Sequence, residues 1–228
     1  MAILRCRGRR SGGGSSRYGL KRWIFNATIG LALAFSLPAA AKELRLLAFG
    51  DSLTAGYGLP VEDGFVAQLE RAINAAGVDA VVLDAGVSGD TTAGGRSRIA
   101  WALGDKPTHA LIALGANDAL RGLPPEAAKA NLAAILEATA AAGVPVLLAG
   151  MRAPRNWGDD YVEQFDAIYP ALAAEMSAPL YPFFLEGVAL DPALNQADGI
   201  HPNAAGVEAI VAGLLPSVLH LLQQEPRP

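Results

Sequence analysis

The chain has 228 residues, of which 52% are hydrophobic, and a formal net charge of −4 at pH 7. The first 41 residues hold seven Lys and Arg and no acid, so the rest keeps 18 − 7 = 11 basic residues against 22 acidic ones, a net charge of −11. Such an acidic surface repels polyanions, and no basic run or stacking pattern argues otherwise. No nucleic-acid partner is therefore expected.

The N-terminal segment is typical of an export signal. A basic stretch precedes an apolar run at residues 23–37, and a small-residue cleavage site follows at 38–41. The run is shorter than the about 20 residues of a membrane span, although an uncleaved anchor is the alternative. We predict a cleaved signal peptide over 1–41, a periplasmic or secreted protein, a single domain over 42–228, and no stable membrane span after cleavage. The only cysteine, Cys6, lies in the leader, so the domain has no disulfide and no thiol chemistry.

Five short apolar runs are typical of buried strands, at residues 44–49, 80–85, 109–114, 144–150 and 180–184. Helical patterns alternate with them, near residues 65–73, 95–103, 124–142, 161–177 and 207–222. Strands that alternate with helices predict a parallel sheet covered on both faces, and continuous apolar strands fit burial on both sides. The sequence therefore predicts an α/β fold.

Residues that can do chemistry follow the strands. Ser52, Gly89 and Asn117 each come just after an apolar run, so a parallel sheet brings them to one rim, where open α/β sheets bind ligands. Asp198 and His201 are three residues apart before the last helix. This spacing can turn the carboxylate toward one imidazole nitrogen while the other nitrogen faces Ser52, as in a hydrolytic triad.

Each of these residues also has an ordinary structural explanation. Ser52 can cap a helix, Asn117 can form an Asx-turn and Gly89 an ordinary turn, and His201 can be a surface histidine. No Gly-x-Ser-x-Gly, dinucleotide fingerprint or P-loop is present. With one histidine in the loops and no cysteine, we expect no metal site. The combination of segments, rather than any single one, carries the functional interpretation.

Together, the four segments resemble the SGNH (GDSL) hydrolase family, and within it the thioesterase I/lysophospholipase/arylesterase subgroup. The matching blocks are residues 50–58, 88–92, 117–122 and 198–202. The resemblance implies a flavodoxin-like three-layer αβα sandwich, with five parallel strands in the order 2-1-3-4-5. One departure is Ala116, where subgroup members often carry a second glycine.

The resemblance also assigns roles. Ser52 would be the nucleophile, His201 the base and Asp198 its partner, while the N–H groups of Ser52 and Gly89 and the Asn117 amide would form the oxyanion hole. The reaction would be hydrolysis of a small-molecule ester through an acyl-serine intermediate, without metal or cofactor. Aryl esters, short and medium acyl esters, thioesters and lysophospholipids are the substrates that the family suggests.

Two alternatives remain open at this point. One is a carbohydrate O-acetylesterase of the same family, and the other is a non-catalytic ligand-binding module on the same fold. A longer acyl chain needs an apolar trough, and five loop residues are candidates to line it: Leu120, Leu123, Met151, Trp157 and Tyr161. Trp157 and Tyr161 can instead pack beneath their loop.

Overall fold

The computed structural model describes residues 43–225. The predicted signal peptide at 1–41 lies outside these residues. The described residues belong to one compact unit.

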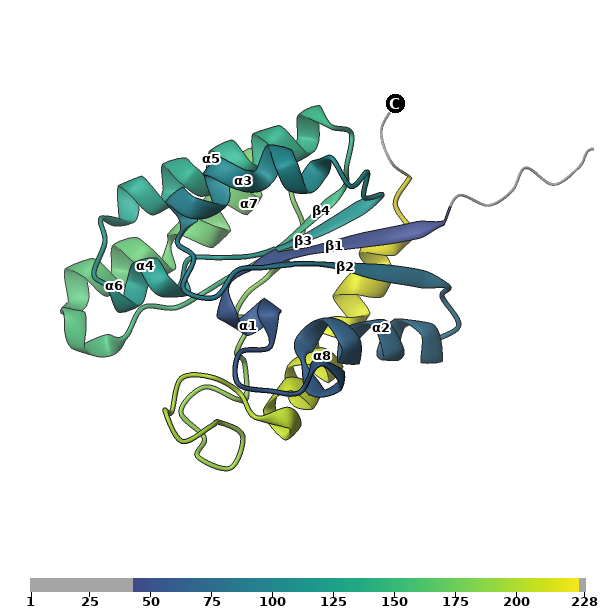
Figure 1. Cartoon of the computed structure of the whole chain (residues 1–228). Helices are drawn as coiled ribbons and strands as arrows, with labels where there is room; N and C mark the ends of the chain where they lie inside the picture. Colours follow the sequence, from purple (N-terminus) through teal and green to yellow (C-terminus); the bar gives the residue numbers. More distant parts are fainter. Residues whose placement is uncertain (1–42, 226–228) are drawn as a thin grey trace, which may run out of the picture. The chain divides into compact units, whose positions relative to one another are not determined.

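A five-stranded parallel sheet forms the centre of the domain, and its strand order is β2-β1-β3-β4-β5, as predicted (Figure 1). The strands are β1 (Leu44–Gly50), β2 (Ala80–Gly86), β3 (His109–Ala113), β4 (Val146–Ala149) and β5 (Leu180–Tyr181). All of β3 and the last five residues of β1 are buried. This burial on both faces explains why these strands read as continuous apolar runs.

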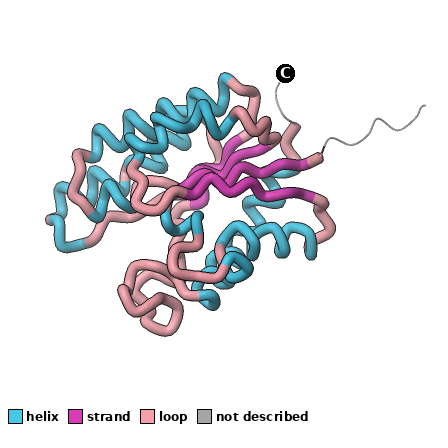
Figure 2. The backbone as a smooth tube through the Cα atoms, viewed as in Figure 1, coloured by secondary structure: helices cyan, strands magenta, loops and turns pink. Residues whose placement is uncertain are grey.

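Helices cover both faces of the sheet. The chain forms α1 (Ser52–Ala55), α2 (Phe65–Ala75), α3 (Thr92–Leu103), α4 (Ala116–Leu120), α5 (Pro125–Ala141), α6 (Asp159–Asp166), α7 (Ile168–Met176) and α8 (Ala204–Leu222), with 3₁₀ turns at Val61–Asp63 and Arg155–Trp157. Helices α3, α5 and α7 lie on one face, and α2 and α8 lie on the other (Figures 1 and 2). These are the three layers of the predicted sandwich.

Helix α8 is long and apolar enough to cross a membrane by length and composition, with a hydropathy of 1.8. It packs against α2, β3 and β4, and its apolar stripe from Val207 to Leu222 supplies seven buried residues. The stripe therefore belongs to the core of the domain.

The structure differs from the sequence prediction in two helical regions. The single helix expected over 161–177 is two helices with a break at Ala167. Pro170 has no N–H to bond to the Asp166 carbonyl, so the helical ladder cannot run through this point. Helix α4, which holds Asn117, was not predicted, because five residues are too few to show a helical period.

The ends of three strands lie side by side and begin the functional rim. Gly50 of β1 pairs with Gly86 of β2 and with Ala113 of β3. A Cβ at Gly86 would collide with the backbone of Ala55 in α1. Glycine thus allows the Ser52 turn to pack directly against the end of the neighbouring strand.

Candidate active site

Ser52 is the first residue of α1, and Asp51 rather than Ser52 caps this helix. The Leu53 N–H donates to Asp51 Oδ1 at 3.0 Å. Since Asp51 satisfies the helix end, the Ser52 hydroxyl is available for another partner. Ser52 is only 9% exposed, so the residue is largely shielded from bulk water.

That partner is His201, which lies 149 positions away in the sequence. Ser52 Oγ and His201 Nε2 are 2.9 Å apart, and His201 Nδ1 and Asp198 Oδ2 are 2.7 Å apart. The carboxylate requires the imidazole proton on Nδ1, which leaves Nε2 to accept from the serine hydroxyl. The structure therefore brings Ser52, His201 and Asp198 into one hydrogen-bonded chain, in the order that a general base and its orienting acid need.

Asp198 is held as an ionised acceptor. Its Oδ1 accepts the N–H groups of Ile200 and His201, both at 3.0 Å. The hydrogen bond from the His201 side chain, followed by these two backbone bonds, lowers the pKa of Asp198 from 3.8 to about 2. Asp198 is therefore charged at pH values well above 2 and can orient the imidazole.

The segment that carries His201 is fastened to the Ser52 side of the rim. Gln196 Nε2 donates to the carbonyls of Tyr57, at 2.7 Å, and Pro202, at 2.9 Å. The Tyr57 ring lies against the imidazole, with centroids 4.6 Å apart, and Asn203 caps α8 through its side chain. These contacts set the distance between the imidazole and the serine.

Gly89 and Asn117 form the other side of the rim. Gly89 has a φ of +79°, in a turn that the Asp90 N–H closes by donating to the Val87 carbonyl at 3.0 Å. Asn117 is the second residue of α4, which follows Gly115, whose φ is +116°. Both positions depend on glycine for the left-handed backbone, and both residues line the same cavity as Ser52.

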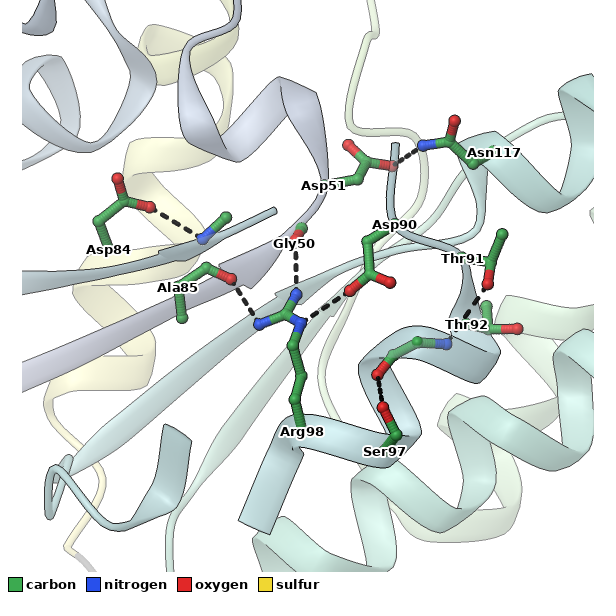
Figure 3. Close-up of polar contacts among 12 residues, drawn as sticks. Gly50, Asp51, Asp84, Ala85, Asp90, Thr91, Thr92, Ser97, Arg98 and Asn117 are labelled. Carbon is green, nitrogen blue, oxygen red and sulfur yellow. Dashed lines mark hydrogen bonds and ion pairs between the residues drawn. The ribbon is translucent and has the colours of Figure 1, made fainter. Parts of the chain in front are cut away.

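The Asn117 amide is oriented from both of its ends. Its Nδ2 donates to Asp51 Oδ2 at 3.3 Å, as Figure 3 shows, and its Oδ1 accepts from Arg121 Nη2 at 3.4 Å. A carboxylate needs a donor and a guanidinium needs an acceptor, so these partners fix which end is nitrogen. One of the two amide hydrogens remains available for a substrate oxygen.

Asp51 is fully buried beneath this amide. Burial raises the pKa of the Asp51 carboxyl from 3.8 to about 6, while the hydrogen bonds from Leu53 and Asn117 act against the rise. Desolvation disfavours the charged form of a buried acid. The sequence shows that Asp51 directly precedes Ser52. It did not predict the raised pKa of the Asp51 carboxyl or its contact with Asn117.

A cavity of about 730 Å³ opens over Ser52, His201, Gly89 and Asn117. Its walls are mainly apolar and include Leu120, Met151, Ala153, Pro154, Phe183, Leu185, Leu190 and Ile200. Arg152, Arg155 and Asn156 also line it. The cavity can hold an apolar group next to the Ser52 hydroxyl, as the prediction for Leu120 and Met151 required.

The structure does not bring Leu123, Trp157 and Tyr161 to this cavity. Trp157 and Tyr161 line a separate, shallower hollow, and the Trp157 ring lies against Gly122. Tyr161 donates its hydroxyl to the Leu123 carbonyl at 2.8 Å. These contacts correspond to the packing alternative, in which the aromatic side chains support their loop. Phe183, Leu185 and Leu190 take their place in the cavity wall; they lie in loops, where no periodic pattern marks them.

The GDSL-like Lipase/Acylhydrolase family matches residues 48–209 of the chain. The chain belongs to this family. It is 41% identical over 193 residues to Esterase TesA of Pseudomonas aeruginosa, across 84% of this chain and 96% of TesA. It is 42% identical over 165 residues to Thioesterase 1/protease 1/lysophospholipase L1 of Escherichia coli K12, across 72% of this chain and 78% of that protein.

A solved structure adds to these relatives. AlinE4, an SGNH-hydrolase family esterase, superimposes with a TM-score of 0.67 at 49% identity, across 80% of this chain and 98% of AlinE4. The family and the enzyme class predicted from the four sequence blocks are thus confirmed: the protein is an SGNH hydrolase with esterase and thioesterase relatives.

Ala116 is the departure of this SGNH hydrolase from its subgroup pattern. It is the first residue of α4 and lines the cavity beside Asn117. Alanine adopts the right-handed helical backbone of this position without strain. The left-handed backbone just before α4 belongs to Gly115, which is a glycine. Within residues 43–225, no group of three or more His, Cys, Asp or Glu is arranged to hold a metal ion.

Proposed function

We propose that the enzyme hydrolyses carboxylic esters with aliphatic or aryl acyl parts, through an acyl intermediate on Ser52. One observation carries the proposal: the hydrogen-bonded chain from Asp198 through His201 to Ser52 ends at the floor of an apolar cavity. A binding module would have no need of this chain, which argues against the non-catalytic alternative.

In the first half of the reaction, Ser52 Oγ attacks the ester carbonyl carbon while His201 Nε2 takes the hydroxyl proton. The carbonyl oxygen becomes an oxyanion and accepts hydrogen bonds from the N–H groups of Ser52 and Gly89 and from the Asn117 amide. His201 then gives its proton to the leaving alcohol, and the acyl-serine remains.

In the second half, a water molecule takes the place of the alcohol. His201 accepts its proton, and the resulting hydroxide attacks the acyl-serine carbonyl. Collapse of the second tetrahedral intermediate releases the carboxylic acid and returns the proton to Ser52 Oγ. Asp198 stabilises the imidazolium in both halves.

The cavity favours acyl esters larger than acetate. The cavity is larger than an acetyl group, and its walls are mainly apolar. Each CH₂ of a longer acyl chain that is buried against these walls adds about 0.8 kcal/mol to binding. The names of the relatives, an esterase and a thioesterase/lysophospholipase, agree with such substrates. A carbohydrate O-acetylesterase is therefore the weaker alternative.

The direct test is turnover of p-nitrophenyl esters of graded acyl length by the wild type and by Ser52→Ala. Loss of a triad member typically costs several orders of magnitude in kcat, so we expect turnover to vanish in the variant while the fold is kept. Ser97→Ala, at an exposed serine of α3, is the matched control. Unchanged turnover in Ser52→Ala would refute the proposal, activity on acetate alone would favour the acetylesterase, and no turnover at any length would favour the binding module.

We also propose that the enzyme works in the periplasm or outside the cell. The basic stretch, the apolar run and the small residues at 38–41 support export. Expression of the full chain in a bacterium, followed by fractionation and intact mass measurement, tests this. A cytoplasmic product that retains residues 1–41 would refute it.

A further inference from the structure

Arg98 of α3 joins the two strand ends that lead to Ser52 and Gly89 (Figure 3). Its Nε donates to Asp90 Oδ2 at 2.7 Å, its Nη1 to the Ala85 carbonyl at 2.9 Å, and its Nη2 to the Gly50 carbonyl at 2.8 Å. Gly50 ends β1 two residues before Ser52, and Ala85 is the next-to-last residue of β2. Asp90 directly follows Gly89, so one planar group fixes both segments.

The surroundings of the guanidinium are built for this arrangement. The Arg98 and Asp90 side chains are only 19% and 10% exposed, and the guanidinium lies 3.9 Å from the centroid of the Phe49 ring. A Cβ at Gly94 would collide with the Asp90 carboxylate, so glycine there makes room for the ion pair. The rigid fork and its ring contact are features that lysine cannot reproduce.

Separate contacts tie Gly89 to the Asn117 side of the rim. Arg121 Nη2 donates to the Gly89 carbonyl at 2.9 Å. Asp118 accepts the N–H and the hydroxyl of Thr92 at 2.8 and 2.6 Å. The position of Gly89 relative to Asn117 is thereby set independently of Arg98, which leaves Arg98 to set its position relative to Ser52.

We propose that Arg98 is a positioning residue of the oxyanion hole, which acts by holding the Gly89 N–H in register with Ser52. Arg98 is not among the residues that line the cavity, so its effect reaches the substrate through the two strand ends. The inference rests on the proposed function, because an oxyanion forms only if Ser52 attacks an ester. Misplacement of a catalytic group by about 1 Å can cost about 10²-fold in rate.

The first measurement is the steady-state kinetics of Arg98→Met and Arg98→Lys. We expect kcat to fall about 10- to 100-fold in both, with KM changed by less than about threefold, since the oxyanion donors act on the transition state. Arg96, an exposed arginine on the same helix that bonds the Asn131 side chain, supplies the controls Arg96→Met and Arg96→Lys. We expect these to keep the wild-type kcat.

The second measurement separates positioning from folding. Arg98→Met alone leaves the Asp90 carboxylate buried and unpaired, which destabilises the fold. In Arg98→Met/Asp90→Asn that penalty is relieved, so we expect Tm to recover toward the wild type while kcat stays about 10-fold or more below it. A purely structural salt bridge would restore kcat together with Tm.

The third measurement uses a trifluoromethyl ketone as an inhibitor. Ser52 Oγ adds to its carbonyl carbon while His201 takes the hydroxyl proton, and the carbonyl oxygen becomes an oxyanion in the oxyanion hole. We expect the double variant to bind it more weakly, by the same factor as its loss of kcat/KM. The inference would be overturned if the double variant kept the wild-type kcat or the wild-type inhibition, or if its loss were confined to KM. Failure of all Arg98 variants to fold would also overturn it. Wild-type protein without esterase activity would instead refute the proposed function.

Discussion

The buried Asp51 carboxyl predicts a pH-dependent difference in stability between the wild type and Asp51→Asn. Burial raises its pKa from 3.8 to about 6, so the folded protein holds the proton more tightly than the unfolded chain. The stabilising contribution is fully present below pH 3.8, is lost as the pH rises to 6, and stays absent above. The full rise in pKa corresponds to about 3 kcal/mol.

The asparagine variant removes this term. Between pH 4.5 and pH 8 the wild type loses most of the contribution, so the unfolding free energy of Asp51→Asn minus that of the wild type should increase by about 2 kcal/mol. Urea denaturation of both proteins at the two pH values measures it. A difference that stays constant within about 0.5 kcal/mol would show that the Asp51 carboxyl does not gain its proton on folding, and would refute the reasoning.

The same variant should lose activity. If the new amide oxygen keeps the bond from the Leu53 N–H, its NH₂ group faces Asn117 Nδ2, where two donors meet. The Asn117 amide must then turn over and withdraw its donor from the hole, which we expect to lower kcat about 10- to 100-fold. Asp84→Asn, at an exposed carboxylate two residues before the end of β2, removes one charge from the same region and should leave kcat unchanged.

Further predictions concern the remaining groups. Asn117→Ala should lower kcat about 10²- to 10³-fold with little change in KM, and a raised KM with normal kcat would make the amide a substrate-binding group. Asp198→Asn should lower kcat about 10²- to 10⁴-fold, because an amide nitrogen opposite His201 Nδ1 favours the wrong tautomer; Asp191→Asn, in the same loop, is the control. Lower ionic strength should reduce kcat/KM for acyl-CoA but not for a neutral ester, since the part after residue 41 carries −11; a faster acyl-CoA reaction would show that Arg121, Arg152 and Arg155 dominate the local field.

The sheet was predictable because several independent features of the sequence indicate it. Each strand falls in a mainly apolar run, and the strand ends that meet at Gly50 are followed by residues of recognisable chemistry. The positions of Ser52 and His201 follow from the family blocks. Their separation of 2.9 Å does not, because it depends on contacts of Gln196 with Tyr57 and of Tyr57 with His201, which join segments far apart in the sequence.

The cavity wall was less predictable, since loop side chains can face either way. Trp157 and Tyr161 follow the cavity residues 151–156 in the sequence, but their rings contact each other and Phe165. The Arg98 fork was also invisible, because a lone arginine in a helical pattern reads as a solvated side chain. Its partners are two carbonyls and a carboxylate from separate segments, which only the folded sheet brings together.

The separation of 149 positions between Ser52 and His201 has a consequence for the order of assembly. All five strands are made before the chain reaches its base, and the imidazole meets the hydroxyl only when the segment before α8 closes against Tyr57. Hydrolysis therefore reports completion of the domain rather than formation of its sheet. During refolding, recovery of circular dichroism should precede recovery of turnover, since contacts of long sequence separation form late. A chain that ends before Asp198 would contain the serine and all five strands of the sheet and have no base to activate the serine.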